Sequence, residues 1–448
     1  MLLKYSVSNF MSIGHNIEFS MFPLGDSIDE RFLTEIDTVA GKWKVLKRGV
    51  FFGPNASGKT SFVKSLEYAK RYILREGAKN LPTTNVNQFK FKLPEYNGIT
   101  TFQFVMCIDR KIYSYGFSLD NSYIHEEWLS IMGKDRTFIP LFDRLTNKRR
   151  KTTIKVNKNH LCKSPKEDNL IAILKESFEE KQARNLFLYR LSEEYSFTIA
   201  DEVYSWFKNI TIIYPDSMIK DLPVVLRYQT NLKNFLSESL QTLDTGIDSI
   251  KVSTKSERTN LADFVEKYNI PDELRNQILE AQNGAINING KLFIFGEEKS
   301  VIMLIELKFM HKLYDKYVPF NVDEESDGTK RLIDILPVLF TLEKRQKDDS
   351  IFIIDELDRS LHTKLSKYFV EAFVRSATNT QLLFTTHDVN LLNLKNFRQD
   401  EIWFIEKNKN GETRLKPFSD FDIINKESIL KDYLAGRFGA VPVIKEDI

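Results

Sequence analysis

Short runs of alternating or continuous apolar residues in the first 130 positions predict strands. Three of these runs are Leu2–Val7, Ile17–Met21 and Val45–Phe52. Three more follow, rich in β-branched and aromatic residues and separated by polar turn residues: Thr101–Cys107, Ile112–Leu119 and Tyr123–Ser130. The last three predict an antiparallel meander. Between the two groups, the apolar residues of Ser61–Arg75 recur at helical spacing.

The pattern changes near residue 140 and again near residue 290. Helical spacing occurs in the middle part at Asn169–Leu188, Ala200–Lys208, Tyr228–Leu243 and Leu261–Gln282. Beyond it, Leu292–Phe295 and Val301–His311 indicate strands, and helices at 329–344, 362–376 and 426–435 alternate with strands at 350–354, 381–385 and 401–406. We therefore expect an N-terminal lobe over 1–135, a mainly helical insertion over 136–290 and a C-terminal lobe over 291–448.

Composition excludes several classes of protein. The 448 residues are 42% hydrophobic and 28% charged, which is too apolar for a disordered chain. The net charge of +2 gives no global reason to expect nucleic-acid binding. Cys107 and Cys162 cannot build a disulfide framework or a zinc cluster. No apolar stretch approaches the roughly 20 residues of a membrane span, and no signal peptide is visible. We expect a cytoplasmic protein that binds no membrane.

A glycine-rich loop between a predicted strand and a predicted helix is the strongest chemical signal. The pattern G-x-x-x-x-G-K-[ST] is matched by Gly53, Pro54, Asn55, Ala56, Ser57, Gly58, Lys59 and Thr60. Backbone N–H groups of such a loop surround a β-phosphate. Lys59 is expected to neutralise the β- and γ-phosphates, and Thr60 to ligate Mg²⁺. The sequence thus predicts a site for ATP and Mg²⁺.

The apolar strand 350–354 ends in two carboxylates, Asp355 and Glu356. By itself this is typical of a buried strand whose acids begin a loop. Together with a P-loop, it predicts that Asp355 holds Mg²⁺ through water and that Glu356 orients or deprotonates the attacking water.

Two further polar motifs occur near predicted strand or helix ends. Ser326 or Asp327 can cap the helix at 329–344, which would direct its N-terminal amides and positive dipole end at an anion. His387 follows the strand at 381–385. An ordinary N-cap and a structural histidine are the simpler interpretations of each motif alone.

Four elements follow one another along the chain: the glycine loop, the Ser326–Gly328 motif, the carboxylate strand and His387. In this order they resemble the ABC-type ATPase heads of the SMC and recombination-repair class. The resemblance covers the first 130 residues and everything beyond about 290. It implies an α/β P-loop NTPase with a mixed sheet, an antiparallel β meander and a helical insertion. It also implies roles for further residues: Ser326, Asp327 and Gly328 in the signature motif, Asp358 in the D-loop, His387 as the switch histidine, and Gln88, with Gln103 as alternative, in the Q-loop. Glu325 departs from the transporter form, which has Leu there.

The opening Val7–Ile13, the stretch Glu356–His362 and the tail Tyr433–Pro442 narrow the resemblance. Together they look like the AAA/ABC-type ATPases of bacterial phage-defence and abortive-infection systems, of which the ATPase component of the PARIS system is one. The resemblance implies composite ATP sites in a homodimer or higher oligomer, and a phage protein as possible trigger. Only 92 residues follow Glu356, so we expect no fused Toprim nuclease and a separate effector, nuclease or toxin.

Seven basic residues in Arg144–Lys158 are followed by no acid until Glu167. A solvated hairpin is the simpler interpretation, and a phosphate-contacting patch for DNA or an acidic partner is the functional one. Three hypotheses remain. The first is an ATP-hydrolysing sensor in phage defence that controls a separate effector. The second is an SMC-like repair ATPase that acts directly on DNA, and the third is a scaffold with little turnover. The absence of sustained heptads disfavours the second, and the presence of Lys59 and Glu356 disfavours the third.

Overall fold

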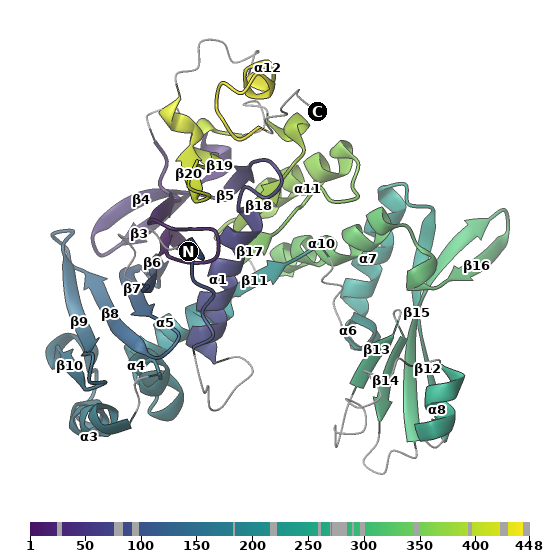
Figure 1. Ribbon diagram of the computed structural model, residues 1–448. Helices are drawn as coiled ribbons and strands as arrows, with labels where there is room; N and C mark the ends of the chain where they lie inside the picture. Colours follow the sequence, from purple (N-terminus) through teal and green to yellow (C-terminus); the bar gives the residue numbers. More distant parts are fainter. Residues whose placement is uncertain are drawn as a thin grey trace. The chain divides into compact units, whose positions relative to one another are not determined.

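A computed structural model describes the chain except residues 25–28, 76–83, 92–97, 182–183, 216–221, 259–260, 269, 271–284, 289–290, 296–300, 345–348, 393–396, 422–428 and 442–448. The chain forms two compact units (Figure 1). The first contains residues 1–213, 345–358 and 370–448, and the second contains 214–344 and 359–369. Among the described residues, no helix is long and apolar enough to cross a membrane.

The first unit contains a six-stranded mixed sheet. Its order is β11 (Ile210–Ile213), β17 (Ile351–Ile354), β18 (Gln381–Thr386), β5 (Arg48–Phe52), β19 (Ile402–Lys407) and β20 (Thr413–Pro417). The first five strands are parallel, and only β20 is antiparallel to its neighbour. Every residue of β5, β17 and β18 is buried, as continuous apolar runs of central parallel strands require. The predicted mixed sheet is therefore confirmed.

Helices α1 (Lys59–Leu74) and α5 (Thr198–Lys208) belong to the same unit. The buried residues of α1 include Phe62, Val63 and Leu66, which follow the predicted helical spacing. The ring centroid of Phe62 lies 4.7 Å from that of Phe51 in β5. The other α-helices that the structure describes in this unit are α2 (Lys158–Leu161), α3 (Pro165–Lys181), α4 (Phe187–Tyr189) and α12 (Ile429–Leu434), whereas α11 (Thr363–Ser376) has residues in both units.

A seven-stranded antiparallel sheet completes the first unit. Its order is β10 (Thr152–Val156), β9 (Phe138–Thr146), β8 (Ile124–Met132), β7 (Lys111–Leu119), β6 (Thr100–Ile108), β1 (Leu2–Ser8) and β2 (Ile17–Ser20). A separate hairpin consists of β3 (Leu33–Thr38) and β4 (Gly41–Leu46). The predicted meander is confirmed as β6–β8. Tyr5 of β1 connects this sheet to α1, because its hydroxyl donates to Ser65 Oγ at 2.7 Å.

The expected insertion at 136–290 begins too early, since the meander continues through β9 and β10. The basic run Arg144–Lys158 contains most of this hairpin. Arg144 is fully buried, and its guanidinium lies 3.2 Å from the Glu127 carboxylate of β8. The positive charge of the run is thus partly neutralised inside the sheet. Helix α5 and strand β11 also belong to the first unit.

The second unit is not mainly helical. It contains a five-stranded sheet with the order β12 (Ile247–Arg258), β15 (Val301–Leu313), β14 (Lys291–Phe295) and β13 (Ala285–Ile288), and β16 (Lys316–Phe320) pairs with β15. Its described α-helices are α6 (Leu222–Tyr228), α7 (Thr230–Thr242), α8 (Leu261–Lys267) and α10 (Asp327–Lys344). Much of the helix expected at Leu261–Gln282 lies outside the described residues. The predicted strand at Val301–His311 is confirmed as the start of β15, which pairs with three other strands of this sheet.

Candidate active site

The glycine loop connects the end of β5 to the first residue of α1, as predicted. Gly58 has a φ of +113°, a left-handed conformation that only glycine adopts without strain. A Cβ at Gly53 would lie 2.2 Å from the Ile405 carbonyl oxygen, so this position also excludes a side chain. No side-chain hydrogen bond caps α1 at Gly58. The backbone N–H groups at the N-terminus of α1 are therefore suited to bind an anion.

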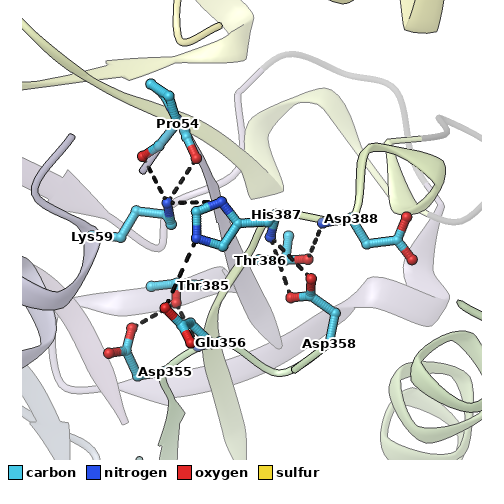
Figure 2. A network of polar contacts seen from close by, with 10 residues as sticks. Pro54, Lys59, Asp355, Glu356, Asp358, Thr385, Thr386, His387 and Asp388 are labelled. Carbon is cyan, nitrogen blue, oxygen red and sulfur yellow. Dashed lines mark hydrogen bonds and ion pairs between the residues drawn. The ribbon is translucent and has the colours of Figure 1, made fainter. Parts of the chain in front are cut away.

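Lys59 lies folded back along its own loop. Its Nζ donates to the carbonyl oxygens of Gly53 at 2.7 Å and Pro54 at 3.0 Å, and it lies 3.3 Å from His387 Nδ1 (Figure 2). Burial lowers the pKa of Lys59 to about 8, although the charges of Asp355, Glu356 and Asp358 oppose this shift. The amine is thus bound to the loop, but desolvation makes its protonated form less stable than that of an exposed lysine.

Asp355 and Glu356 follow β17, next to the parallel strand β18, as the sequence indicated. Thr385 Oγ1 donates to Asp355 Oδ1 at 2.7 Å and accepts from the Glu356 backbone N–H at 2.8 Å (Figure 2). The Glu356 backbone has a φ of +48°, which turns the chain out of the strand. Asp355 is buried, whereas a third of the Glu356 side chain is exposed. Thr385 was not predicted as a site residue, and its position near the end of the predicted strand before His387 was the signal that the sequence offered.

His387 joins the lysine to the carboxylates. Its Nε2 lies 3.9 Å from Glu356 Oε1, and its backbone N–H faces both carboxylate oxygens of Asp358 at 3.2 and 3.3 Å (Figure 2). Burial, and then the charge of Lys59, lower the pKa of His387. A neutral ring that accepts from Lys59 at Nδ1 must carry its proton on Nε2, on the side of Glu356. Three predicted residues, His387, Glu356 and Asp358, therefore lie together with Lys59.

The residues present suit a magnesium ion. Mg²⁺ prefers oxygen ligands and binds through one or two protein groups plus water and phosphate oxygens. Thr60 offers a hydroxyl in the first turn of α1, and Asp355 offers a carboxylate that Thr385 orients. Among the described residues, no cluster of three or more His, Cys, Asp or Glu side chains forms an all-protein metal site. The oxygen pair thus suits a metal that arrives with a nucleotide.

The proposed signature residues lie in the second unit. Ser326 caps α10, because its Oγ accepts from the Thr329 backbone N–H at 3.1 Å. A Cβ at Gly328 would lie 2.8 Å from the Ser360 carbonyl oxygen, so this helix start packs closely against its neighbour. Asp327 is the first residue of α10, and its carboxylate lies 3.7 Å from Lys330 Nζ.

Neither glutamine considered for the Q-loop joins this network. Gln88 donates its side-chain amide to the Gly98 carbonyl, and Gln103 lies within β6 and donates to Ser114 Oγ at 3.2 Å. The strand next to β17 is β11, and the Asp355 N–H donates to the Ile213 carbonyl at 2.9 Å. The end of β11 therefore lies beside Asp355 at the carboxyl end of β17. The sequence pattern did not single out β11.

Comparison with known proteins finds a matching family model and solved structures of low sequence identity. A family model described as "AAA domain, putative AbiEii toxin, Type IV TA system" matches residues 50–393. The SMC head domain from Thermotoga maritima is 10% identical, covers 94% of this chain and 99% of that chain, and has a TM-score of 0.37. An SMC head bound to the C-winged helix domain of ScpA is 10% identical, covers 93% and 96%, and has a TM-score of 0.36. No curated protein matches the chain.

The family match spans well over half of the chain, from β5 and the glycine loop through the carboxylate strand to His387. The parallel strands, the loop and the carboxylate pair have the arrangement of a P-loop NTPase. The chain therefore belongs to the AAA domain family described as putative AbiEii toxin, Type IV TA system.

Proposed function

We propose that this chain binds ATP with Mg²⁺ and hydrolyses it to ADP and phosphate. The observation that carries the proposal is the network of Lys59, His387 and Glu356 at the carboxyl ends of buried parallel strands. Ligands of open α/β sheets bind at this edge. The loop from Gly53 to Thr60 supplies backbone amides for the phosphates, and Lys59 moves from its own loop carbonyls to a phosphate oxygen.

Glu356 is the group best placed to act on water. Its carboxylate is partly exposed, whereas Asp355 beside it is buried and bound by Thr385. Glu356 would accept a proton from the attacking water. The Nε2–H of neutral His387 would donate a hydrogen bond to that water or stabilise the negative charge that develops on the phosphate. Thr60 and Asp355 would hold Mg²⁺, which when bound neutralises charge on the phosphate oxygens.

Replacement of Glu356 tests this assignment. Glu356→Gln keeps the shape of the side chain but removes the base, so turnover should fall by about 10²- to 10⁴-fold. Nucleotide affinity should stay within about twofold, because the loop and Lys59 are intact. Steady-state phosphate release and titration with a fluorescent ATP analogue measure the two effects.

Glu371→Gln provides a matched control, because this helical carboxylate is half exposed and lies 4.0 Å from Arg375. The control should hydrolyse ATP at the wild-type rate. Near-normal hydrolysis by Glu356→Gln would remove Glu356 from the role of base.

At the level of the cell, we propose a cytoplasmic sensor or regulator in anti-phage defence. ATP-dependent assembly into a homodimer or higher oligomer would control a separate effector, nuclease or toxin, in response to a phage protein. The family description, which names a putative toxin of a Type IV toxin–antitoxin system, supports this setting. The capped helix that begins at Asp327 supports a role for Ser326, Asp327 and Gly328 in completing the ATP site of another copy.

A second candidate function rests on a different observation. The turn between β9 and β10 contains four consecutive exposed basic residues, Lys148–Lys151. This turn could contact DNA phosphates, as expected for an SMC-like repair ATPase that acts on DNA itself. Arg144 takes no part in such a surface, because it is buried against Glu127.

A further inference from the structure

Behind the glycine loop, three hydroxyl groups from distant parts of the chain meet. Thr413, at the start of β20, is 1% exposed, and its Oγ1 donates to the Ser57 carbonyl at 2.9 Å. Ser12 Oγ lies 2.8 Å from Thr413 Oγ1 and 2.8 Å from Ser61 Oγ in the first turn of α1. We refer to Ser12, Ser61 and Thr413 as the hydroxyl clamp. It spans the loop from Ser57 to the residue after Thr60.

The clamp touches the backbone turn on which the loop's shape depends. A Cβ at Gly58 would lie 2.0 Å from Thr413 Oγ1 and 2.9 Å from Ser12 Oγ. The two hydroxyls therefore fill the space that the missing side chain leaves open. Thr413 thus forms a hydrogen bond to the Ser57 carbonyl and leaves no space for a side chain at position 58. Both effects favour the left-handed conformation of Gly58.

The clamp is itself held by a buried carboxylate. Glu412 is fully buried and accepts from Asn408 Nδ2 at 2.6 Å, Arg414 Nη2 at 2.9 Å and the His15 backbone N–H at 3.3 Å. The Thr413 backbone N–H donates to the Ser12 carbonyl at 2.7 Å. The N-terminal loop and the β19–β20 turn are thus tied together at Glu412, directly beside Thr413.

We propose that Thr413, assisted by Ser12, is a positioning residue that keeps the glycine loop in its phosphate-binding conformation. The inference rests on the proposed binding of ATP at this loop. A loop already fixed in shape loses less conformational entropy when the phosphates bind. The clamp orients the backbone through the Ser57 carbonyl and Gly58, so it acts on nucleotide affinity more than on the chemical step.

The pair Thr413→Val and Thr413→Ser separates the hydroxyl from the side-chain volume. Valine removes the donor to the Ser57 carbonyl and should raise both the Kd for a fluorescent ATP analogue and the KM for ATP about tenfold. The kcat should stay within about twofold, since the lost binding is common to ground and transition states. Serine retains the hydroxyl and should bind within about threefold of wild type.

Thr152→Val is the control for a general loss of stability. It removes a buried hydroxyl that lies 3.0 Å from Thr146 Oγ1 in the seven-stranded sheet, away from the loop. Thermal unfolding without nucleotide should shift in both valine variants, but Kd should change only in Thr413→Val. Equal Kd values in Thr413→Val and wild type would overturn the clamp.

Ser12→Ala provides a second route if Thr413→Val does not fold. It should raise Kd about threefold, and an unchanged Kd would overturn the clamp. Failure of the wild-type chain to bind ATP would overturn the proposed function together with the clamp. Wild-type binding that no clamp variant weakens would overturn the clamp alone.

Discussion

Lys59 shows how one residue combines opposing physical effects. Desolvation destabilises its charge, and three carboxylates at the same sheet edge stabilise it, with the net result that its pKa falls to about 8. Its amine donates to two carbonyl oxygens of its own loop. Binding of a polyphosphate would replace these neutral partners with anionic ones and raise the pKa again.

This shift predicts a pH dependence of nucleotide affinity. Below about pH 8 the free amine is protonated and binding needs no proton, whereas above it each binding event must take one up. The Kd for ATP should therefore be flat from pH 6.5 to 7.5 and rise by up to about tenfold per pH unit above 8.

Fluorescence titration from pH 6.5 to 9.5 measures this dependence, and calorimetry in buffers of different ionisation enthalpy measures the proton uptake. Lys59→Arg is the control, because a guanidinium stays charged throughout this range. A flat Kd up to pH 9.5 in the wild-type chain would contradict the lowered pKa.

The β9–β10 hairpin shows at the scale of an element how a charge run divides in three dimensions. Arg144 points into the protein and pairs with Glu127, which also accepts from the backbone N–H groups of Phe187 and Leu188. The four basic residues of the turn remain exposed, and Asn147 shapes this turn by accepting from the Arg149 and Lys151 backbone N–H groups. The part available to a partner is thus the turn.

Charge reversal in this turn tests DNA contact. If the turn contacts phosphates, Arg149→Glu together with Arg150→Glu should weaken DNA binding about tenfold or more, and should lower the salt dependence by about two phosphate contacts. Lys312→Glu with Lys316→Glu, at the exposed tip of the β15–β16 hairpin, is the matched control. Fluorescence anisotropy with a labelled duplex at several salt concentrations measures both pairs. Unaltered, salt-insensitive binding would leave the turn as a solvated hairpin.

At the scale of the whole molecule, the loop and the catalytic candidates lie in the first unit, and the capped Ser326–Gly328 motif lies in the second. We propose above that this motif completes the ATP site of another copy of the chain. Assembly would then depend on bound nucleotide, because ATP would bridge the loop of one copy and the α10 N-terminus of the other.

We therefore expect two variants to differ in their assembly state when ATP is present. Glu356→Gln should retain ATP and shift to a dimer or larger oligomer, whereas Lys59→Ala should lose affinity and remain in its nucleotide-free state. Mass photometry with and without ATP and Mg²⁺ measures both. An oligomer of the same size in both variants, whether ATP is present or absent, would show that assembly does not depend on composite sites.

The sequence by itself determined the local features of this protein. The glycine loop, the carboxylate strand and the strand that leads to His387 could be predicted, because short apolar runs and fixed spacings are local properties. The meander of β6–β8 was predictable for the same reason. Charge and helical spacing were poorer guides where long-range pairing decides, as in β9, β10 and the sheet of the second unit.

Only the tertiary structure decided which distant residues meet. Thr385 at Asp355, Thr413 at Ser57, and the end of β11 at the same sheet edge involve contacts across up to 356 residues of sequence. No local pattern encodes such pairs, because the order of parallel strands and the closure of loops are set by burial of the whole core. The same holds for the protonation of Lys59, which depends on desolvation and neighbouring charge.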